Sequence, residues 1–136
     1  RSGARLGHDT AYDHMFLDGL EDAYEEGRAM GTFAQETANE YRLTREEMDD
    51  YSIESLRRAN AAIESGAFDG EVVPITIVTR KGETTVEHDE APGKGKPDKI
   101  PQLRPAFAKD GTITAATSSS ISDGAAAVVL SRVRWD

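Results

Sequence analysis

Residues 125–130 (AAAVVL) form an uninterrupted apolar run close to the C-terminal end of the sequence. Apolar residues without polar alternation are typical of a β-strand that is covered on both faces. Such a strand needs neighbouring strands, and the rest of the sequence offers few candidates for them. The first residue is Arg1 rather than methionine. We therefore expect the sequence to be an internal part of a longer chain, with the missing strands elsewhere in it.

The composition is that of a globular protein with one modest core. Of the 136 residues, 38% are hydrophobic and 30% are charged, which argues against disorder. The net charge of -9 makes nucleic acid an improbable partner, because acidic surfaces repel phosphate backbones. No apolar run is long enough to cross a bilayer, and no signal peptide is visible. We predict a location in the cytoplasm or an organelle matrix.

The absence of cysteine excludes disulfides, thiolate metal sites and cysteine catalysis within these residues. The three histidines, His8, His14 and His88, do not have the spacing of metal ligands. We therefore expect no metal site.

Helical periodicity predicts about three helices. Residues 11–24 and 32–41 carry apolar side chains at helical spacing, although Gly19 interrupts the first of these segments. The third helix is predicted within residues 44–66, because Thr44 and Glu47 have the spacing of a capping box. Its apolar stripe comprises Met48, Ser52, Leu56, Ala59 and Ile63, and Gly66 is a natural end.

The second half of the sequence favours strands and loops. Residues 72–79 and 83–87 predict a small hairpin, with Pro74 favouring an edge position. Residues 89–102 are rich in Pro and Gly and predict neither helix nor strand. Residues 113–116 suggest a short strand, followed by a polar loop at 117–122. The expected fold class is α+β.

Several polar groups have both a functional and a structural interpretation. A cluster of four acidic residues suggests a cation site, a pair of adjacent acidic residues suggests a general acid–base pair, and His14 suggests a general base. For each of these the structural interpretation is favoured, because solvated acidic faces are common and neighbouring strand residues point apart. The acidic groups are Glu21, Asp22, Glu25 and Glu26, and the pair Asp89 and Glu90.

A run of serines and a group of lysines are the stronger candidates for ligand contacts. Residues 118–120 are all serine, but they lack the Gly-x-Ser-x-Gly motif of a nucleophile elbow. Their hydroxyls suit hydrogen bonds to a ligand or to the backbone. Lys94, Lys96 and Lys99 lie in the Pro/Gly-rich segment. They either contact a ligand phosphate as point charges or form a solvated loop.

Five segments together resemble thiolases in residues, order and spacing, and most closely the acetyl-CoA acetyltransferase branch. These are residues 19–23 (GLEDA), 29–36 (AMGTFAQE), 103–107 (LRPAF), 110–119 (DGTITAATSS) and 122–127 (SDGAAA). Each segment is weak evidence alone, but together they span nearly the whole sequence.

The resemblance implies an organisation in three parts. Residues 1–13 would belong to the extension that thiolases use in tetramer contacts. Residues 14–121 would form the loop domain, an insertion that covers the active site and binds coenzyme A. Residues 122–136 would return as a strand to the sheet of the N-terminal half. The expected partners are the rest of the thiolase chain and further copies, as a homotetramer or dimer.

The resemblance also implies an acyltransferase of fatty acid metabolism that makes and cleaves 3-ketoacyl-CoA by reversible Claisen condensation and thiolysis. Thiolases use a nucleophilic cysteine, a histidine and a second cysteine. These would lie before Arg1 and after Asp136, so no catalytic residue is expected here and the isolated segment should be inactive. Coenzyme A and its thioesters are the implied substrates, with no bound cofactor.

Coenzyme A contacts are the part of the family's site that can be carried over. By position, the matching residues are Leu20, Met30, Ala115, Ser119 and Ile121. Two departures from the family pattern are Ala29, where many relatives have histidine, and Thr117, where asparagine is common. The family's phosphate-contacting arginine has no clear counterpart, and Lys94 or Lys96 would replace it.

Two alternative functions are compatible with the residues. The first is a non-enzymatic acidic interaction domain, which the self-contained third helix favours. The second is a thiolase-like protein that binds acyl-CoA without catalysis.

Overall fold

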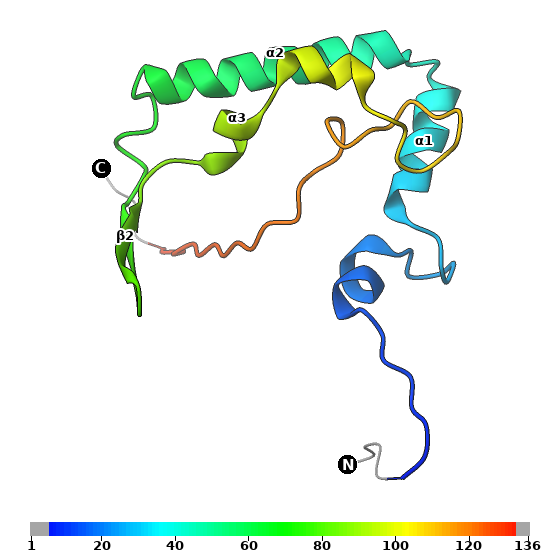
Figure 1. Cartoon of the computed structure of the whole chain (residues 1–136), viewed down its shortest axis with the longest axis horizontal. Helices are drawn as coiled ribbons and strands as arrows, with labels where there is room; N and C mark the ends of the chain where they lie inside the picture. The colour runs from blue at the N-terminus through cyan, green and yellow to red at the C-terminus, as the bar shows by residue number, and fades with distance from the viewer. Residues whose placement is uncertain (1–5, 133–136) are drawn as a thin grey trace.

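The computed structural model describes residues 6–132, so the first residues of the predicted extension and the last of the predicted returning strand lie outside it. A long helix, α2, runs across the molecule, and the other elements lie along it or at its ends (Figure 1). The elements are, in chain order, the π-helix η1 (Phe16–Leu20), α1 (Met30–Glu40), α2 (Arg45–Glu64), β1 (Ile75–Thr79), β2 (Gly82–Val86), α3 (Glu90–Lys94) and the 3-10 helix η2 (Pro97–Gln102). Helices and one small antiparallel sheet confirm the α+β class.

Helix α2 begins where the capping box predicts. The Thr44 hydroxyl accepts a hydrogen bond from the Glu47 amide at 3.2 Å, and the Thr44 amide donates to the Glu47 carboxylate at 2.9 Å. These bonds satisfy two of the amides that the first turn leaves free. After the helix, Gly66 takes a left-handed conformation with φ of 69°. The prediction of this helix is confirmed.

The predicted hairpin is also present. β1 and β2 pair from Ile75 opposite Val86 to Thr79 opposite Gly82. The Thr76 and Thr85 hydroxyls lie 3.3 Å apart across the strands. Every residue of both strands is exposed within the described structure.

Helix α1 confirms the prediction for residues 32–41 and is tied to a distant segment by Gln35. This side chain is 7% exposed. Its amide oxygen accepts hydrogen bonds from the Thr112 and Ile113 amides at 2.8 and 3.2 Å, and its nitrogen donates to Asn39 and to the Thr112 hydroxyl. One side chain therefore joins α1 to residues 112–113 and satisfies both backbone amides there.

The expectation that residues 89–102 contain no helix is wrong. The Asp89 carboxylate caps α3 by accepting from the Ala91 amide at 3.0 Å. Pro97 occupies the start of η2, where its missing amide costs nothing. Ile100 is 7% exposed and buried, and η2 packs on α2. Local caps and packing on α2 thus outweigh the low helix propensity of Pro and Gly.

The first predicted helix is shorter than expected, and the last predicted short strand is absent from the described residues. The helix expected at residues 11–24 is reduced to a short segment containing η1, because Glu21 ends it in an extended conformation and pairs with Ala29 in an isolated bridge. The strand expected at 113–116 does not form. Ile113 and Thr114 are nevertheless buried. The Ile113 amide donates to the Gln35 side chain on α1 and the Thr114 amide to the Thr117 hydroxyl, so neither amide needs a neighbouring strand.

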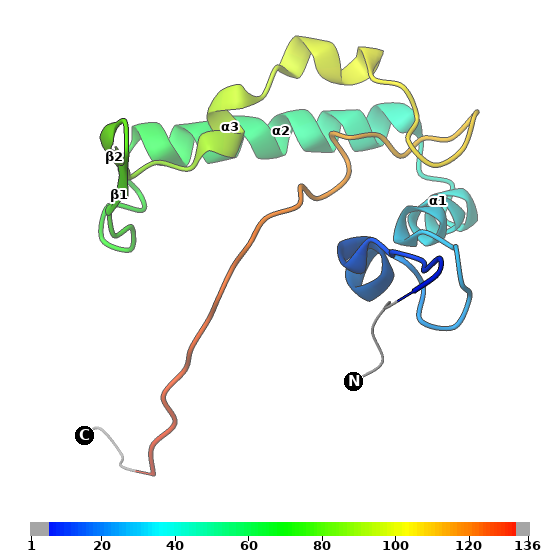
Figure 2. The ribbon, with the colours of Figure 1, turned by 60° about the horizontal axis from the view of Figure 1, so that its bottom comes forward.

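Residues 125–130 are extended but form no strand. Figure 2 shows this segment running away from α2 toward the C-terminus. Val128, Val129 and Leu130 are 85%, 96% and 91% exposed. Within residues 6–132, β1 and β2 pair only with each other, so no strand is available to this segment. The returning strand and the boundaries at 13 and 121 remain predictions.

Candidate functional site

A cavity of about 590 Å³ lies between α2, the α3–η2 segment and the polar loop after Thr114. Its volume is in the range of small-molecule sites. The lining residues that matter here come from these three walls. They are Ser52, Ser55, Leu56 and Ala59 from α2, Lys94, Lys96, Lys99 and Leu103 from the second wall, and Ala115, Ala116, Ser118 and Ser120 from the third.

The apolar stripe of α2 provides the first wall. Ser52, Leu56 and Ala59 recur at helical spacing and therefore face the same side. The Ser52 hydroxyl donates to the Met48 carbonyl at 2.9 Å. The sequence stripe that predicts the buried face of α2 therefore supplies the cavity wall, and its small residues leave space for the cavity.

The second wall carries the lysines and approaches α2 closely at Gly95. A Cβ on Gly95 would lie 2.5 Å from Cδ2 of Leu56, so only glycine fits without displacement. Lys94, Lys96 and Lys99 all line the cavity and are exposed. Three lysines and one carboxylate, that of Asp89, thus line one cavity of a chain whose net charge is -9. This local concentration of positive charge suits an anionic ligand.

One of these lysines is paired with a carboxylate. Lys94 forms an ion pair with Glu90, which lies one helical turn before it. The hydrogen bond from Lys94 lowers the pKa of Glu90, so Glu90 is charged at neutral pH. Both side chains are more than half exposed, at 74% and 67%. Water therefore screens the pair, and Lys94 can exchange Glu90 for another anion at small cost.

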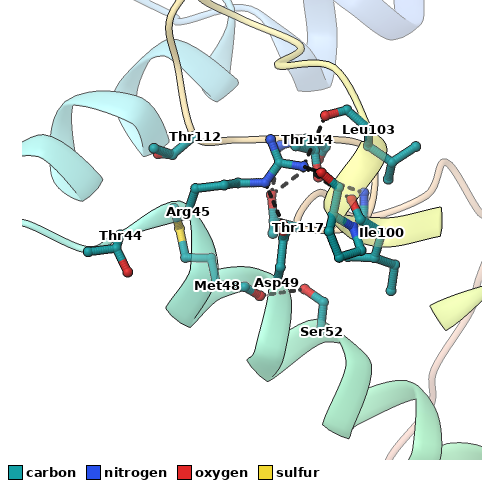
Figure 3. Close-up of polar contacts among 12 residues, drawn as sticks. Thr44, Arg45, Met48, Asp49, Ser52, Ile100, Leu103, Thr112, Thr114 and Thr117 are labelled. Carbon is teal, nitrogen blue, oxygen red and sulfur yellow. Dashed lines mark hydrogen bonds and ion pairs between the residues drawn. The ribbon is translucent and has the colours of Figure 1, made fainter. Parts of the chain in front are cut away.

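The C-terminal end of η2 is attached to α2 by Arg45. Figure 3 shows the Arg45 guanidinium between Asp49 and the carbonyls of Ile100 and Leu103. Nε donates to Asp49 at 2.7 Å, and one terminal nitrogen donates to those two carbonyls at 3.1 and 2.9 Å. Asp49 is buried, with 4% of its surface exposed.

The third wall is a loop folded by its own hydroxyls. Thr114 is fully buried, and its amide donates to the Thr117 hydroxyl at 2.8 Å. The Ser118 hydroxyl donates to the Thr114 carbonyl at 2.8 Å. The Ser120 and Ser122 hydroxyls lie 3.4 Å apart. These contacts support the interpretation of the serine run as a hydrogen-bonding loop.

The structure brings together only some of the residues expected to contact coenzyme A. Lys94, Lys96 and Ala115 line the cavity, whereas Ser119 lines a neighbouring cavity of about 570 Å³ that shares Ser52, Ser55, Ala116 and Ser118 with it. Ile121 is 66% exposed and lines neither.

Leu20 and Met30 lie next to the antiparallel bridge between Glu21 and Ala29. Leu20 is the last residue of η1, and Met30 is the first residue of α1. Neither residue lines the lysine cavity. The Phe107 ring packs directly on Gly31, the residue after Met30, since a Cβ built on Gly31 would lie 2.1 Å from it.

The other polar candidates have structural roles. Asp22 accepts from the Tyr24 and Glu25 amides, and Glu21 accepts from the Gly27 amide. Glu25 pairs with Arg28 at 2.6 Å. His14 is exposed. No group of three metal-ligating side chains is found in residues 6–132, and no helix in this range is long and apolar enough to cross a membrane.

Ser52 and Ser55 of α2 line the cavity, but sequence reasoning did not single them out as ligand contacts. Ser52 belongs to the predicted stripe, and a serine among apolar stripe residues was the available signal. Ser55 carries no such signal, because it lies beside the stripe.

Comparison with known proteins gives one consistent family for this sequence. The family model described as "Thiolase, N-terminal domain" matches residues 1–134. The acetyl-CoA acetyltransferase of Escherichia coli (strain K12) is 47% identical over 131 residues, which cover 96% of this chain and 33% of that protein. The chain thus spans about a third of the length of the curated relatives it matches.

Solved structures agree with the sequence comparison. The acetyl-CoA acetyltransferase from Syntrophomonas wolfei superposes with a TM-score of 0.76 at 38% identity, covering 88% of this chain and 30% of that one. The Acat5 thiolase from Ascaris suum, solved in complex with coenzyme A, gives a TM-score of 0.75 at 41% identity and covers 89% and 30%.

Proposed function

The chain belongs to the thiolase family, and we propose that it is the coenzyme A-binding part of an enzyme that condenses and cleaves 3-ketoacyl-CoA thioesters. The observation that carries the proposal is the cavity where three lysines face a hydroxyl-rich loop across the small-residue stripe of α2. Coenzyme A has a phosphorylated nucleotide end and a thin pantetheine arm. This cavity offers groups for both.

The lysines are assigned to the phosphates. Lys94 and Lys96 replace the family's arginine, and each ammonium can approach a phosphate oxygen from the rim of the cavity. Ala115 and Ser119 are assigned to the pantetheine arm, together with Leu20, Met30 and Ile121. Leu20 and Met30 lie next to the Glu21–Ala29 bridge and are 37% and 40% exposed, which leaves apolar surface for this arm.

The catalytic groups are assigned to other parts of the protein. The chain has no cysteine, so it cannot supply the nucleophile of a thiolase. We expect the 136-residue chain alone to show no thiolysis. Sequencing the coding region on both sides tests this assignment directly. Catalytic cysteines encoded on both sides would support the enzyme, and a start codon before Arg1 with a stop codon after Asp136 would contradict it.

The exposed apolar side chains support packing against the rest of a thiolase. Val73, Ile75 and Val78 around the hairpin are 75%, 60% and 72% exposed, and Val128, Val129 and Leu130 are 85%, 96% and 91% exposed. So many large apolar side chains open to solvent are typical of surfaces that another part of a protein covers. We assign this surface to the remaining thiolase chain and to further copies in a homotetramer or dimer, within the cytoplasm or an organelle matrix.

The test of coenzyme A binding is charge reversal at the cavity in the full-length protein. We expect Lys94→Glu/Lys96→Glu to weaken coenzyme A binding at least about tenfold in calorimetry, because each lost charge-assisted contact costs about 1.5–3 kcal/mol. Lys81→Glu is the matched control, since Lys81 is an exposed lysine in the hairpin turn and does not line the cavity.

Two outcomes would contradict the proposal. If the wild-type protein does not bind coenzyme A, the chain is better explained as an interaction domain. If binding is present but unchanged in the double variant, the lysines belong to a solvated loop.

A further inference from the structure

We propose that Arg45 and Asp49 are positioning residues for the phosphate end of the ligand, because they fix the lysine-bearing segment 94–103 over the cavity. This inference rests on the proposed coenzyme A site and adds residues that do not line the cavity themselves. Neither residue belongs to the set that the family resemblance assigns to ligand contacts.

The contacts of Arg45 are concentrated on the end of η2. One terminal nitrogen reaches the Ile100 and Leu103 carbonyls at 3.1 and 2.9 Å, and the Pro101 carbonyl lies 3.4 Å away (Figure 3). The Ile100 carbonyl also accepts the last hydrogen bond of η2, from the Leu103 amide at 3.1 Å, so Arg45 binds the end of this helix in addition to its own backbone bond. A guanidinium is always charged and presents several donors in one plane, so a single side chain can hold several carbonyls together.

Asp49 fixes the orientation of that guanidinium. Its Oδ2 accepts from Nε of Arg45 at 2.7 Å, one helical turn away on α2. The Asp49 side chain is 6% exposed, and within the described residues its Oδ1 is buried without a hydrogen-bond partner. Burying an incompletely satisfied carboxylate is costly, and apolar contacts stabilise a packed segment more cheaply. The cost is consistent with a role in which the exact position of the segment matters.

The lysines lie between two attachment points on α2. At one end, Gly95 packs against Leu56 so closely that no Cβ fits. At the other, Arg45 holds the carbonyls that directly follow Lys99. Between them, the Lys99 amide donates to the Lys96 carbonyl at 2.9 Å, so both residues share one turn of η2. Removing Arg45 therefore releases one end of the turn that carries Lys96 and Lys99.

Fixing the backbone matters for these lysines because their side chains are long and solvent-exposed. Each loses rotamer freedom when it binds a phosphate, so affinity depends on how well the backbone is already placed. Loss of Arg45 should consequently weaken binding of the phosphate-bearing end of coenzyme A and leave binding of its pantetheine arm unchanged.

The experiment compares Arg45→Ala and Arg45→Lys with Arg58→Ala in the full-length protein. Arg58 is on the same helix, but it is 74% exposed and pairs with Glu54. Amide hydrogen exchange of residues 95–103 is measured without ligand. Affinities for coenzyme A and for pantetheine, which has no nucleotide phosphates, are then measured by calorimetry. The same Arg45→Ala change is repeated in a Lys94→Gln/Lys96→Gln/Lys99→Gln background.

We expect Arg45→Ala to speed exchange in residues 95–103 and to weaken coenzyme A binding about tenfold, the effect of losing one charge-assisted contact. Pantetheine affinity should be unchanged, and the effect should disappear in the triple-glutamine background. Arg45→Lys keeps the charge but not the planar fork, and should show an intermediate effect in a protein that remains folded.

Three results would overturn the inference. Unchanged exchange in residues 95–103 would remove the attachment itself, whether or not coenzyme A binds. Equal losses for coenzyme A and pantetheine, or an undiminished loss without the lysines, would reduce Arg45 to a general stabilising residue. A failure of the wild-type protein to bind coenzyme A would instead refute the proposed function, and the exchange data would still decide whether Arg45 holds the segment.

Discussion

Gln35 shows how one buried amide connects two segments that are distant in sequence. It satisfies the backbone amides of Thr112 and Ile113 and makes two further hydrogen bonds with its own nitrogen. Gln35→Leu would leave these two amides unpaired. We expect it to lower the free energy of unfolding by about 2–4 kcal/mol, because each unsatisfied buried group costs about 1–3 kcal/mol. Urea unfolding followed by circular dichroism measures the change.

Gln102→Leu is the matched control for this prediction. Gln102 is also a helix-associated glutamine, but it is exposed and its nitrogen makes a hydrogen bond to the Asp98 carbonyl at 3.0 Å. Its loss should change stability by less than about 0.5 kcal/mol, as for most surface substitutions. Equal effects of the two substitutions would show that the Gln35 contacts contribute little.

Glu54 should titrate at an unusually low pH. Hydrogen bonds from Arg57 and then Arg58, at 2.6 to 2.7 Å, lower its pKa to about 2. Because the folded-state pKa is depressed, the contribution of Glu54 to stability is complete above the usual glutamate pKa. It is lost as the pH falls from there toward 2. An NMR titration of the Glu54 carboxyl checks the pKa.

Arg57→Ala should raise the pKa of Glu54, and high salt should raise it in the wild type, since the pair is exposed and screened by ions. A wild-type pKa in the usual glutamate range would contradict the geometry. So would an Arg57→Ala variant that titrates like the wild type.

At the scale of elements, the sequence predicts what local signals determine. The capping box and apolar stripe predict α2, and β-branched residues around a turn predict the hairpin. For residues 89–102 local signals predict too little helix. Their low helix propensity opposes the helices that the Asp89 cap, Pro97 and packing on α2 stabilise. For residues 11–24 local signals predict too much helix, since the apolar spacing continues past the point where Glu21 pairs with Ala29.

The contact of α3 with α2 can be tested with two glycines that are close in sequence. Gly95 has a negative φ of -63°, so alanine fits its backbone conformation, but the added Cβ would lie 2.5 Å from Leu56. We expect Gly95→Ala to lower the free energy of unfolding by about 1–3 kcal/mol through overpacking. Chemical unfolding measures the effect, and hydrogen exchange in residues 96–103 locates it.

Gly93→Ala provides the comparison, because nothing lies within 4 Å of a Cβ built there. Alanine at Gly93 should be neutral or slightly stabilising, since it restricts the unfolded chain. If both substitutions destabilise the protein equally, the cause is local helix geometry and not the approach to Leu56.

For the whole molecule, the candidate site depends on contacts between distant segments. The sequence singles out Lys94, Lys96 and the serine run, but it does not show that they share a cavity with α2. That arrangement depends on Arg45 and its bonds to carbonyls more than fifty residues away. Backbone carbonyls carry no residue-specific signal, so such contacts cannot be inferred from residue types. Leu20 and Met30, by contrast, lie next to a bridge between Glu21 and Ala29, which are close in sequence.

The burial of residues 125–130 should differ most between the 136-residue chain alone and the proposed full-length enzyme. Val129 is 96% exposed here, yet its apolar run is typical of a strand covered on both faces. We expect Val129→Asp to destabilise the full-length protein by about 3 kcal/mol or more, because an unpaired charge would be buried. In the 136-residue chain the same change should cost less than about 0.5 kcal/mol, since the position is open to solvent. Val129→Ile, which keeps an apolar β-branched side chain, should be tolerated in both proteins. The wild type and the two variants are each unfolded in urea, both as the full-length protein and as the 136-residue chain. Equal effects of Val129→Asp in the full-length protein and in the shorter chain would mean that no sheet covers this segment.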